Sequence, residues 1–483
     1  MIRLTLLWLL IAGASVAAMK DWYKGLCVLI LLMAIIEHPD VPKSILGIQG
    51  LNPWNILLLI VILAWLSQRG VEGLRWDMPR SVQTLLLLYL VVILVSFGRM
   101  IVDREAVLSF AILRGSEIPS TGSLVSEHLI NSLKWVLPGL LLFDGCRDRT
   151  RLRMGMGALL LVYFLLSVQV IKWMPLSEIT GGDALSNRSL KILINEIGYH
   201  RVNLSMMLAG ASWAIFASRE LIGGAGRSLW MFIASFVVLF GQALTGGRMG
   251  YVTWALVGVV LIWGRWRRYL LLAPLAVAGV LLIVPGVQER LSQGFTQDTY
   301  RESKRFDAMG YKRGDGPDVY TVTAGRNIAW PMVIDKIKEA PLVGYGKEAM
   351  QRTGLSAYLF NNFREPFPHP HNAYLQLLLD NGLLGGVWIL LFYRLIVKYS
   401  YQLFRDSRSP EFIAAGGCCL ALVLALLVAS MGSQSFYPRE GAVGMWCAIG
   451  LMLRVYVQRS RLPEKSDSSN QEITDESLWG RIA

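Results

Sequence analysis

Three short stretches of the sequence carry residue types that could do chemistry. The first is Thr245-Gly-Gly-Arg248-Met-Gly250, a glycine-rich turn with one arginine. Glycines let backbone amides approach an anion, and a guanidinium group can bind a phosphate through two parallel hydrogen bonds. Arg248 is therefore a candidate phosphate ligand. The alternative interpretation is an arginine that only reaches lipid phosphates at a membrane boundary.

The second stretch is Ala324-Gly-Arg326-Asn-Ile-Ala-Trp330, in which an arginine opens a predicted amphipathic helix. A solvated helix start is the alternative to an anion site there. The third is His369-Pro-His371-Asn372-Ala-Tyr374. Histidine is the side chain best suited to move a proton near neutral pH, and Asn372 is expected to cap the helix that follows. No acidic or cysteine cluster accompanies the two histidines, which argues against a metal site.

Composition indicates which elements must position these residues. Of 483 residues, 54% are hydrophobic and only 17% are charged, whereas about 25% charged is typical of soluble domains. The net charge of +13 would suggest nucleic acid in a soluble protein, but in a membrane protein it reflects topology. Because the charge is explained by topology, we expect no nucleic-acid partner. The five cysteines lie mostly in apolar runs and are expected to pack as small apolar residues.

The apolar runs are continuous and helical in length, so the fold class predicted is an all-α, polytopic integral membrane protein with about 12 to 13 transmembrane helices. The N-terminal run resembles a signal peptide, but a second run follows at once, and both are expected to be retained. The candidate spans are 3–19, 25–36, 52–67, 81–98, 128–143, 154–174, 202–217, 229–245, 250–264, 269–285, 383–397, 411–432 and 441–457.

Lysine and arginine in the short loops predict the orientation of the spans. One set of alternate loops holds 21 basic residues and is assigned to the cytoplasm, while the other set holds nine. The C-terminal tail is then cytoplasmic, and its polar, acidic residues 464–483 are expected to be disordered. The nine on the outer side are Lys43, Arg99, Arg104, Arg114, Arg188, Lys191, Arg201, Arg248 and Arg439.

One long hydrophilic segment, about 286 to 370, falls on the outer side. Its first part is polar and glycine-rich and is expected to be mobile, and residues 326–339 have helical apolar spacing. The expected organisation is 1–285, N-terminal transmembrane helices; 286–382, a large, partly helical periplasmic loop with catalytic residues; 383–457, C-terminal transmembrane helices; and 458–483, a disordered cytoplasmic tail.

The second and third stretches, with a glycine pair between them, resemble the O-antigen ligase and Wzy-type polymerase superfamily. Its members carry GR..W, then P..G.G, then HN..L......G..G. This sequence reads GRNIAW, APLVGYG and PHPHNAYLQLLLDNGLLGG in the same order over about 60 residues. The TGGRMGY turn resembles the family's Ser-Arg-Gly turn more loosely, with Gly247 at the serine position and Met249 at the glycine position.

The resemblance implies glycan transfer at the periplasmic face of the bacterial inner membrane. The donor would be a glycan on undecaprenyl diphosphate, and the acceptor a sugar hydroxyl of lipid A core or of a growing glycan. Arg248 and Arg326 would neutralise the diphosphate, and His371 would deprotonate the acceptor. No cofactor or metal is implied, while membrane lipids and the polysaccharide assembly machinery are expected partners.

Four further residues are predicted to bind substrate. Arg201 is another arginine of the outer side, at the start of a span, and is a predicted diphosphate contact. His369 would assist or orient His371, Asn372 would bind substrate, and Tyr374 would pack against the acceptor or the long loop. For Tyr374 the alternative is an aromatic anchor at the membrane interface.

Two other classes of function compete with glycan transfer. A transporter or flippase for lipid-linked sugars should show repeated halves, broken helices and charges deep within the spans, but the sequence has no internal repeat and few such charges. A membrane scaffold without chemistry has only the hydropathy in its favour. Within the favoured class, no short motif separates ligase from polymerase.

Overall fold

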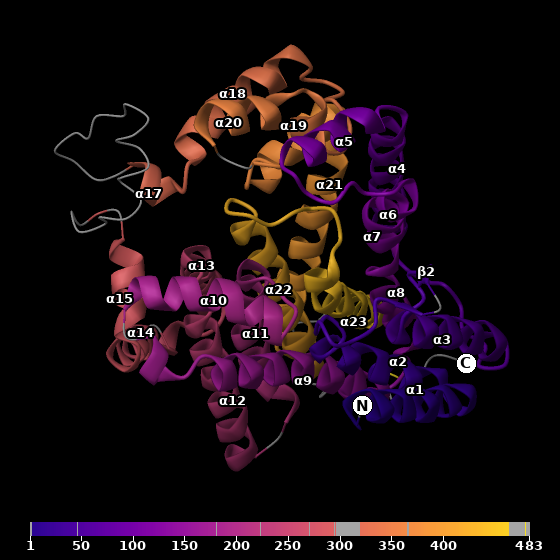
Figure 1. Cartoon of the computed structure of the whole chain (residues 1–483). Coiled ribbons are helices and arrows are strands. Elements are labelled where there is room, and N and C mark those ends of the chain that lie inside the picture. The colour runs from indigo at the N-terminus through magenta and orange to yellow at the C-terminus, as the bar shows by residue number, and fades with distance from the viewer. Residues whose placement is uncertain are drawn as a thin grey trace.

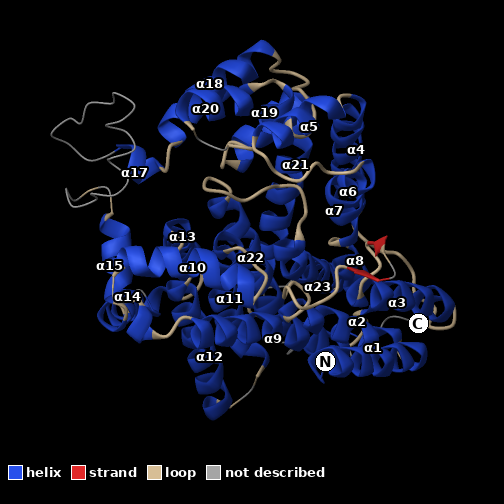
Figure 2. Ribbon diagram, in the orientation of Figure 1, coloured by secondary structure: helices blue, strands red, loops and turns tan. Residues whose placement is uncertain are grey.

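The fold is built almost entirely from helices (Figure 2). The computed structural model describes residues 2–45, 47–179, 181–222, 224–269, 271–293, 295, 319–364, 367–462 and 479. In these ranges the only sheet is an antiparallel pair, β1 (Ser44–Ile45) with β2 (Ile48–Gln49). The segment 296–318, expected to be mobile, and nearly all of the C-terminal tail lie outside the described residues.

The α-helices follow one another along the whole described chain. Their bounds are α1 Ile2–Lys20, α2 Trp22–Leu31, α3 Pro53–Arg69, α4 Arg80–Val102, α5 Arg104–Leu113, α6 Thr121–Val125, α7 Asn131–Lys134, α8 Leu137–Gly145, α9 Arg149–Trp173, α10 Gly182–Glu196, α11 Arg201–Ser218, α12 Ala225–Leu244, α13 Arg248–Gly264, α14 Leu272–Ile283, α15 Pro285–Ser292, α17 Val319–Thr323, α18 Arg326–Glu339, α19 Ala349–Arg352, α20 Leu355–Phe363, α21 Ala373–Arg405, α22 Pro410–Ala429 and α23 Val443–Ser460.

Seven helices among the described residues are long and apolar enough to cross a membrane, and three shorter apolar helices accompany them. An all-helical membrane protein is therefore confirmed, while the count of 12 to 13 spans stays a prediction. The seven are α1, α4, α9, most of α12, α21, α22 and α23, the last taken from Glu440. All five cysteines are buried.

One predicted span is wrong as a single helix, and a second has shorter bounds than predicted. The run 128–143 is divided into a π-helical turn at Ser126–Ile130, then α7 and α8. Pro138 lies in the first turn of α8, where a proline is tolerated because that N–H has no partner within the helix. The run 269–285 ends at Val284, and Pro285 starts the separate helix α15. The amphipathic helix α10 was not foreseen at all.

The core of the body surrounds α11, in which every residue from Leu204 to Ser218 is buried. It packs against α12, α13 and α22. A Cβ atom at Gly210 would lie 2.8 Å from the Cβ of Ala425, so α11 and α22 approach as closely as small residues allow.

Residues 319–372, which contain α17 to α20, form a separate layer that we call the cap. It gathers at one end of the molecule beside α5, and α21 runs from it into the helical body (Figure 1). The cap has a small core of its own, with Ile328, Val333, Met350 and Leu359 buried together. The cap therefore corresponds to part of the long hydrophilic segment predicted from the sequence.

A backbone joint fastens the cap to α21. Four amide groups donate hydrogen bonds across it: Tyr345 to Leu379 O (2.8 Å), Gly346 to Asp380 O (2.6 Å), Leu383 to Pro341 O (2.8 Å) and Leu384 to Leu342 O (3.0 Å). The helix is interrupted at Gly382, with φ 60° and ψ −168°, a region that only glycine adopts readily. A Cβ there would also lie 2.5 Å from the Val343 nitrogen. The joint thus requires glycine.

We predict that Gly382→Ala lowers the stability of the protein by at least about 1 to 3 kcal/mol, because both the backbone angles and the close approach of residues 342–343 exclude a side chain. Thermal unfolding in detergent measures this. Gly157→Ala is the matched control, since Gly157 lies within α9 with nothing within 4 Å of its Cβ position, and it should not lower the midpoint. Equal midpoints for the two variants would contradict the prediction.

Candidate active site

His371 sits at the start of α21 in a strained conformation. Its φ is 53°, which is uncommon for a residue other than glycine and occurs often at functional sites. The next residue caps the helix as predicted: the Asn372 side-chain oxygen accepts hydrogen bonds from the amides of Tyr374 (3.0 Å) and Leu375 (3.2 Å). The Ala373 amide donates to Ser430 O at 2.7 Å. These bonds hold the backbone on the C-terminal side of His371.

Arg326 is the first residue of α18, whose bounds agree with the predicted helix. Gly325 precedes it with φ 76°, a conformation that glycine adopts at little cost. One turn later, the Trp330 indole N–H donates to Pro370 O at 2.9 Å. This contact ties the arginine-bearing helix to the residue before His371, which explains why arginine and tryptophan occur together in the second stretch.

A serine joins the two predicted catalytic residues. Ser433 Oγ lies 3.1 Å from His371 Nδ1 and accepts a hydrogen bond from Arg326 Nη2 at 3.2 Å. It belongs to the loop 430–439 between α22 and α23. Ser433 was not predicted from the sequence, because a lone serine in a short loop carries no motif.

Burial among positive charges makes His371 a neutral imidazole at neutral pH. Its pKa is lowered to about 4, first by burial, then by Arg326 and His200. His369 accepts a hydrogen bond from the His371 amide at 3.3 Å, and burial and His371 lower the pKa of His369 to about 3. Burial also lowers the pKa of Arg326, but an arginine remains charged. Arg326 Nε is buried without a hydrogen-bond partner in the described part of the chain.

The bond to Ser433 bears on which ring nitrogen of His371 can act as a base. Ser433 Oγ can accept hydrogen bonds from Arg326 and from a protonated Nδ1 at the same time. In that tautomer Nε2 keeps its lone pair and can take a proton from a hydroxyl group. When Ser433 accepts hydrogen bonds from both Arg326 and His371, the histidine is therefore in the form that a general base requires.

A second cluster contains Arg201, Arg248 and Arg290. Arg201 Nη1 donates to Ser186 O and Ser186 Oγ at 2.8 Å each. Arg248 Nη1 donates to Gln293 O at 3.3 Å, and Arg290 Nε to Gly246 O at 3.4 Å. Burial, then Arg290 and Arg248, lower the pKa of Arg201 to about 10. Arg290 and Arg248 both disfavour the charge of Arg201, and an anion bound among the three guanidinium groups would relieve that repulsion. Arg290, on α15, was not predicted.

The loop 430–439 links this arginine cluster to the His371 site. Beside Ser433, the Gln434 side chain donates to Val202 O at 3.1 Å, one residue after Arg201. His200 contributes to the lowered pKa of His371, and Arg201 to that of His200. Among the described residues, no direct hydrogen bond joins Arg248 to Arg326 or His371. The predicted residues thus form two neighbouring groups rather than one.

The remaining predicted substrate ligands make contacts within the protein. Tyr374 donates its hydroxyl to Leu427 O at 2.9 Å, and its ring lies 5.1 Å from that of Phe436. Asn372 uses its side-chain oxygen for the helix cap. Their contact with a substrate stays a prediction. Within the described ranges, no group of three histidine, cysteine or acidic side chains could hold a metal ion.

Comparisons with known proteins match parts of the chain. Residues 232–392 match the family described as O-Antigen ligase. A protein of Rickettsia typhi named "Putative polysaccharide ligase" is 22% identical over 220 residues, which cover 44% of this chain and 49% of the relative. One of Rickettsia felis with the same description is 33% identical over 101 residues, 20% of this chain and 24% of the relative.

The chain thus spans about half the length of the first relative and about a quarter of the second. The segment matched by the family contains Arg248, Arg326 and His371. The match over residues 232–392 and the two partial relatives support the resemblance of this membrane protein to the O-antigen ligase family.

Proposed function

We propose that the protein transfers a glycan from undecaprenyl diphosphate to a sugar hydroxyl at the periplasmic face of the inner membrane, the reaction that ligases and polymerases share. The observation that carries the proposal is the serine bridge between a neutral histidine and a buried arginine. A base and a cation held side by side suit a reaction in which one oxygen loses a proton while another gains negative charge.

In the proposed reaction, His371 Nε2 takes the proton of the acceptor hydroxyl, and that oxygen attacks the anomeric carbon of the donor sugar. The bond between this carbon and the diphosphate oxygen breaks, and the diphosphate leaves with the electron pair. Arg326 and Arg248 would stabilise the charge of the diphosphate, with Arg201 and Arg290 as further contacts. Preorganised donors of this kind lower the barrier without reorganising during the reaction.

Replacing either central residue tests the proposal. His371→Ala should lower transfer by about 100-fold to 10,000-fold, as expected for a lost general base, and Arg326→Ala by about 100-fold to 1000-fold. Electrophoresis of surface polysaccharide in complemented deletion cells measures the loss, and an immunoblot of membranes checks protein levels. His38→Ala, in the loop before β1, is the control. Normal polysaccharide in both variants would rule out the mechanism.

The depressed pKa of His371 predicts an unusual pH dependence. Since the free enzyme holds this base neutral down to about pH 4, kcat/KM should fall as the pH drops through about 4. An unshifted histidine would lose about tenfold between pH 7.5 and 5.5, whereas we expect less than about a twofold change over that range. Purified enzyme, with lipid-linked donor well below KM, gives the profile. An inflection near pH 6.5 would contradict the assignment.

Ser433 should act by positioning. Ser433→Ala removes the acceptor shared by Arg326 and His371 and should lower transfer about 10-fold to 100-fold, as losses of supporting hydrogen bonds do. Ser433→Thr keeps the hydroxyl and should restore most of the rate. If the serine orients the ring of His371, the alanine variant should also shift the pH profile. Loss of rate in the threonine variant alone, or equal rates in all three proteins, would exclude this role.

A further inference from the structure

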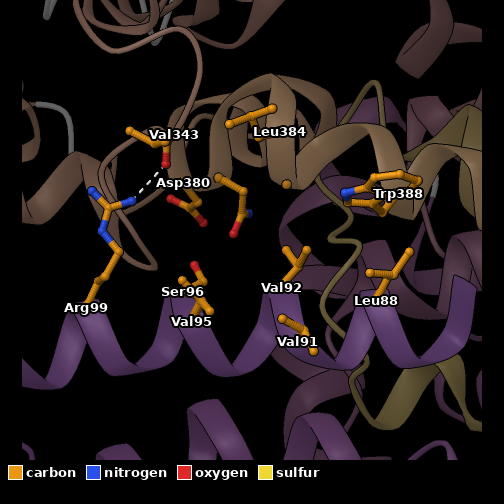
Figure 3. Close-up of a pocket in the computed structure, with 12 residues that line it drawn as sticks. Leu88, Val91, Val92, Val95, Ser96, Arg99, Val343, Asp380, Leu384 and Trp388 are labelled. Atoms are coloured by element: carbon orange, nitrogen blue, oxygen red, sulfur yellow. Dashed lines mark hydrogen bonds between the residues drawn. The ribbon is translucent and has the colours of Figure 1, made fainter. Parts of the chain in front are cut away.

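A groove runs between α4 and α21 on the face of the body that is rich in exposed apolar side chains. Its volume is about 460 Å³. Figure 3 shows Leu88, Val91 and Val95 of α4 facing Leu384 and Trp388 of α21, with Ser96, Arg99 and Asp380 together at one end. The groove is therefore apolar along most of its length and polar at the end near the cap.

The surroundings of the groove suit hydrocarbon rather than water. Both walls belong to candidate membrane spans. Val95 and Leu384 each expose 58% of their surface and Val91 exposes 44%, values that are costly in water and ordinary against lipid tails. From Leu88 to Arg99 is eleven residues, about 17 Å along a helix, which is close to half of a hydrocarbon core of about 30 Å. One hydrocarbon chain from a single leaflet fits this length.

The polar end of the groove carries positive charge. Arg99 donates to Val343 O (2.7 Å) and Gly344 O (2.8 Å), which are neutral groups. A second hollow of about 440 Å³ adjoins it, lined by Arg99 and Arg352. Arg352 pairs with Asp103 at 3.1 Å, and Arg104 is a further cation at the same end of α4. Asp380 also lies at this end, but its carboxylate accepts hydrogen bonds from the Ala349 amide and the Tyr437 hydroxyl. Arg99, which donates to neutral carbonyls, therefore favours an anionic headgroup above the apolar groove.

The groove and the arginine cluster are connected through α21 and α22, the helices beside the proposed base. Helix α21 packs against α4 and against α22, and α22 in turn packs against α11 and α13, which carry Arg201 and Arg248. His371 precedes α21, and Asp380 at the end of the groove follows nine residues later, about 14 Å along the helix. A transferase that passes a sugar directly from donor to acceptor must hold both substrates at once. The arginine cluster suits the diphosphate of one, and the groove is free for the other.

We propose that the α4–α21 groove binds the hydrocarbon anchor of the acceptor, a lipid whose phosphate group lies at Arg99 and Arg352 and whose sugars extend along the first turns of α21 to His371. This inference rests on the proposed function for the identity of the lipid, but the binding of an anionic lipid can be measured without catalysis.

A bulky side chain that fills the groove tests this proposal. Val95→Trp places a large ring in it from a position that is 58% exposed, and Leu94→Trp is the matched control, because Leu94 is 43% exposed on the same helix and does not line the groove. Native mass spectrometry of the full chain, purified in detergent, measures retention of phosphatidic acid and of phosphatidylcholine with the same chains. We expect retention of phosphatidic acid over phosphatidylcholine, and a loss of about tenfold in Val95→Trp only.

The same variants are compared in cells for surface polysaccharide. The proposal requires that Val95→Trp lowers transfer while Leu94→Trp does not. Equal retention of the two lipids would overturn the anionic site, equal retention by the two variants would overturn the groove, and loss of phosphatidic acid with normal transfer would overturn the assignment to the acceptor. If His371→Ala keeps transfer while Val95→Trp loses phosphatidic acid, the proposed mechanism fails and the lipid site stands.

Discussion

The position of Arg326 relative to His371 depends on the backbone joint between residues 341–346 and α21. Its four hydrogen bonds pair peptide groups that would otherwise be left unsatisfied where the helix is interrupted, a serious cost next to hydrocarbon. Arg326 starts the helix that leads into this joint, and His371 starts the helix on its other side. A joint that fixes the two helices therefore fixes the distance between the arginine and the histidine, and the glycine at 382 is the residue that allows it.

The loop 430–439 adds side-chain contacts on both sides of the joint. Ser433 contacts His371 and Arg326, while Tyr437 receives a hydrogen bond from Asn381 (2.8 Å) and donates to the Asp380 carboxylate (3.1 Å). The same loop thus contacts the His371 site through Ser433 and the polar end of the α4–α21 groove through Tyr437. A movement of α22 against α21 would displace this loop both at His371 and at the polar end of the groove. Such a movement would couple the proposed acceptor site to the base.

The sequence alone predicted the structural features that depend on residues close together in the chain. Helix α18 and the Asn372 cap follow from periodicity and side-chain geometry, and each involves neighbours in the chain. Ser433 and Arg290 were missed because their importance comes from partners far away in the sequence, 62 residues in the case of His371 and Ser433. The run 128–143 was misjudged because hydropathy averages over a window and does not register a π-helical turn followed by a proline.

The proposed chemistry also predicts that a bound donor strengthens the base. In the free protein, burial and the neighbouring cations keep His371 neutral, but a base with a pKa of about 4 is a weak one. A bound diphosphate would bring negative charge to the same cations and remove much of their effect on the imidazole, which raises the pKa of His371. A higher pKa strengthens the base only when the donor is in place. The cations that bind the leaving group would in this way also make removal of the acceptor proton depend on the bound donor.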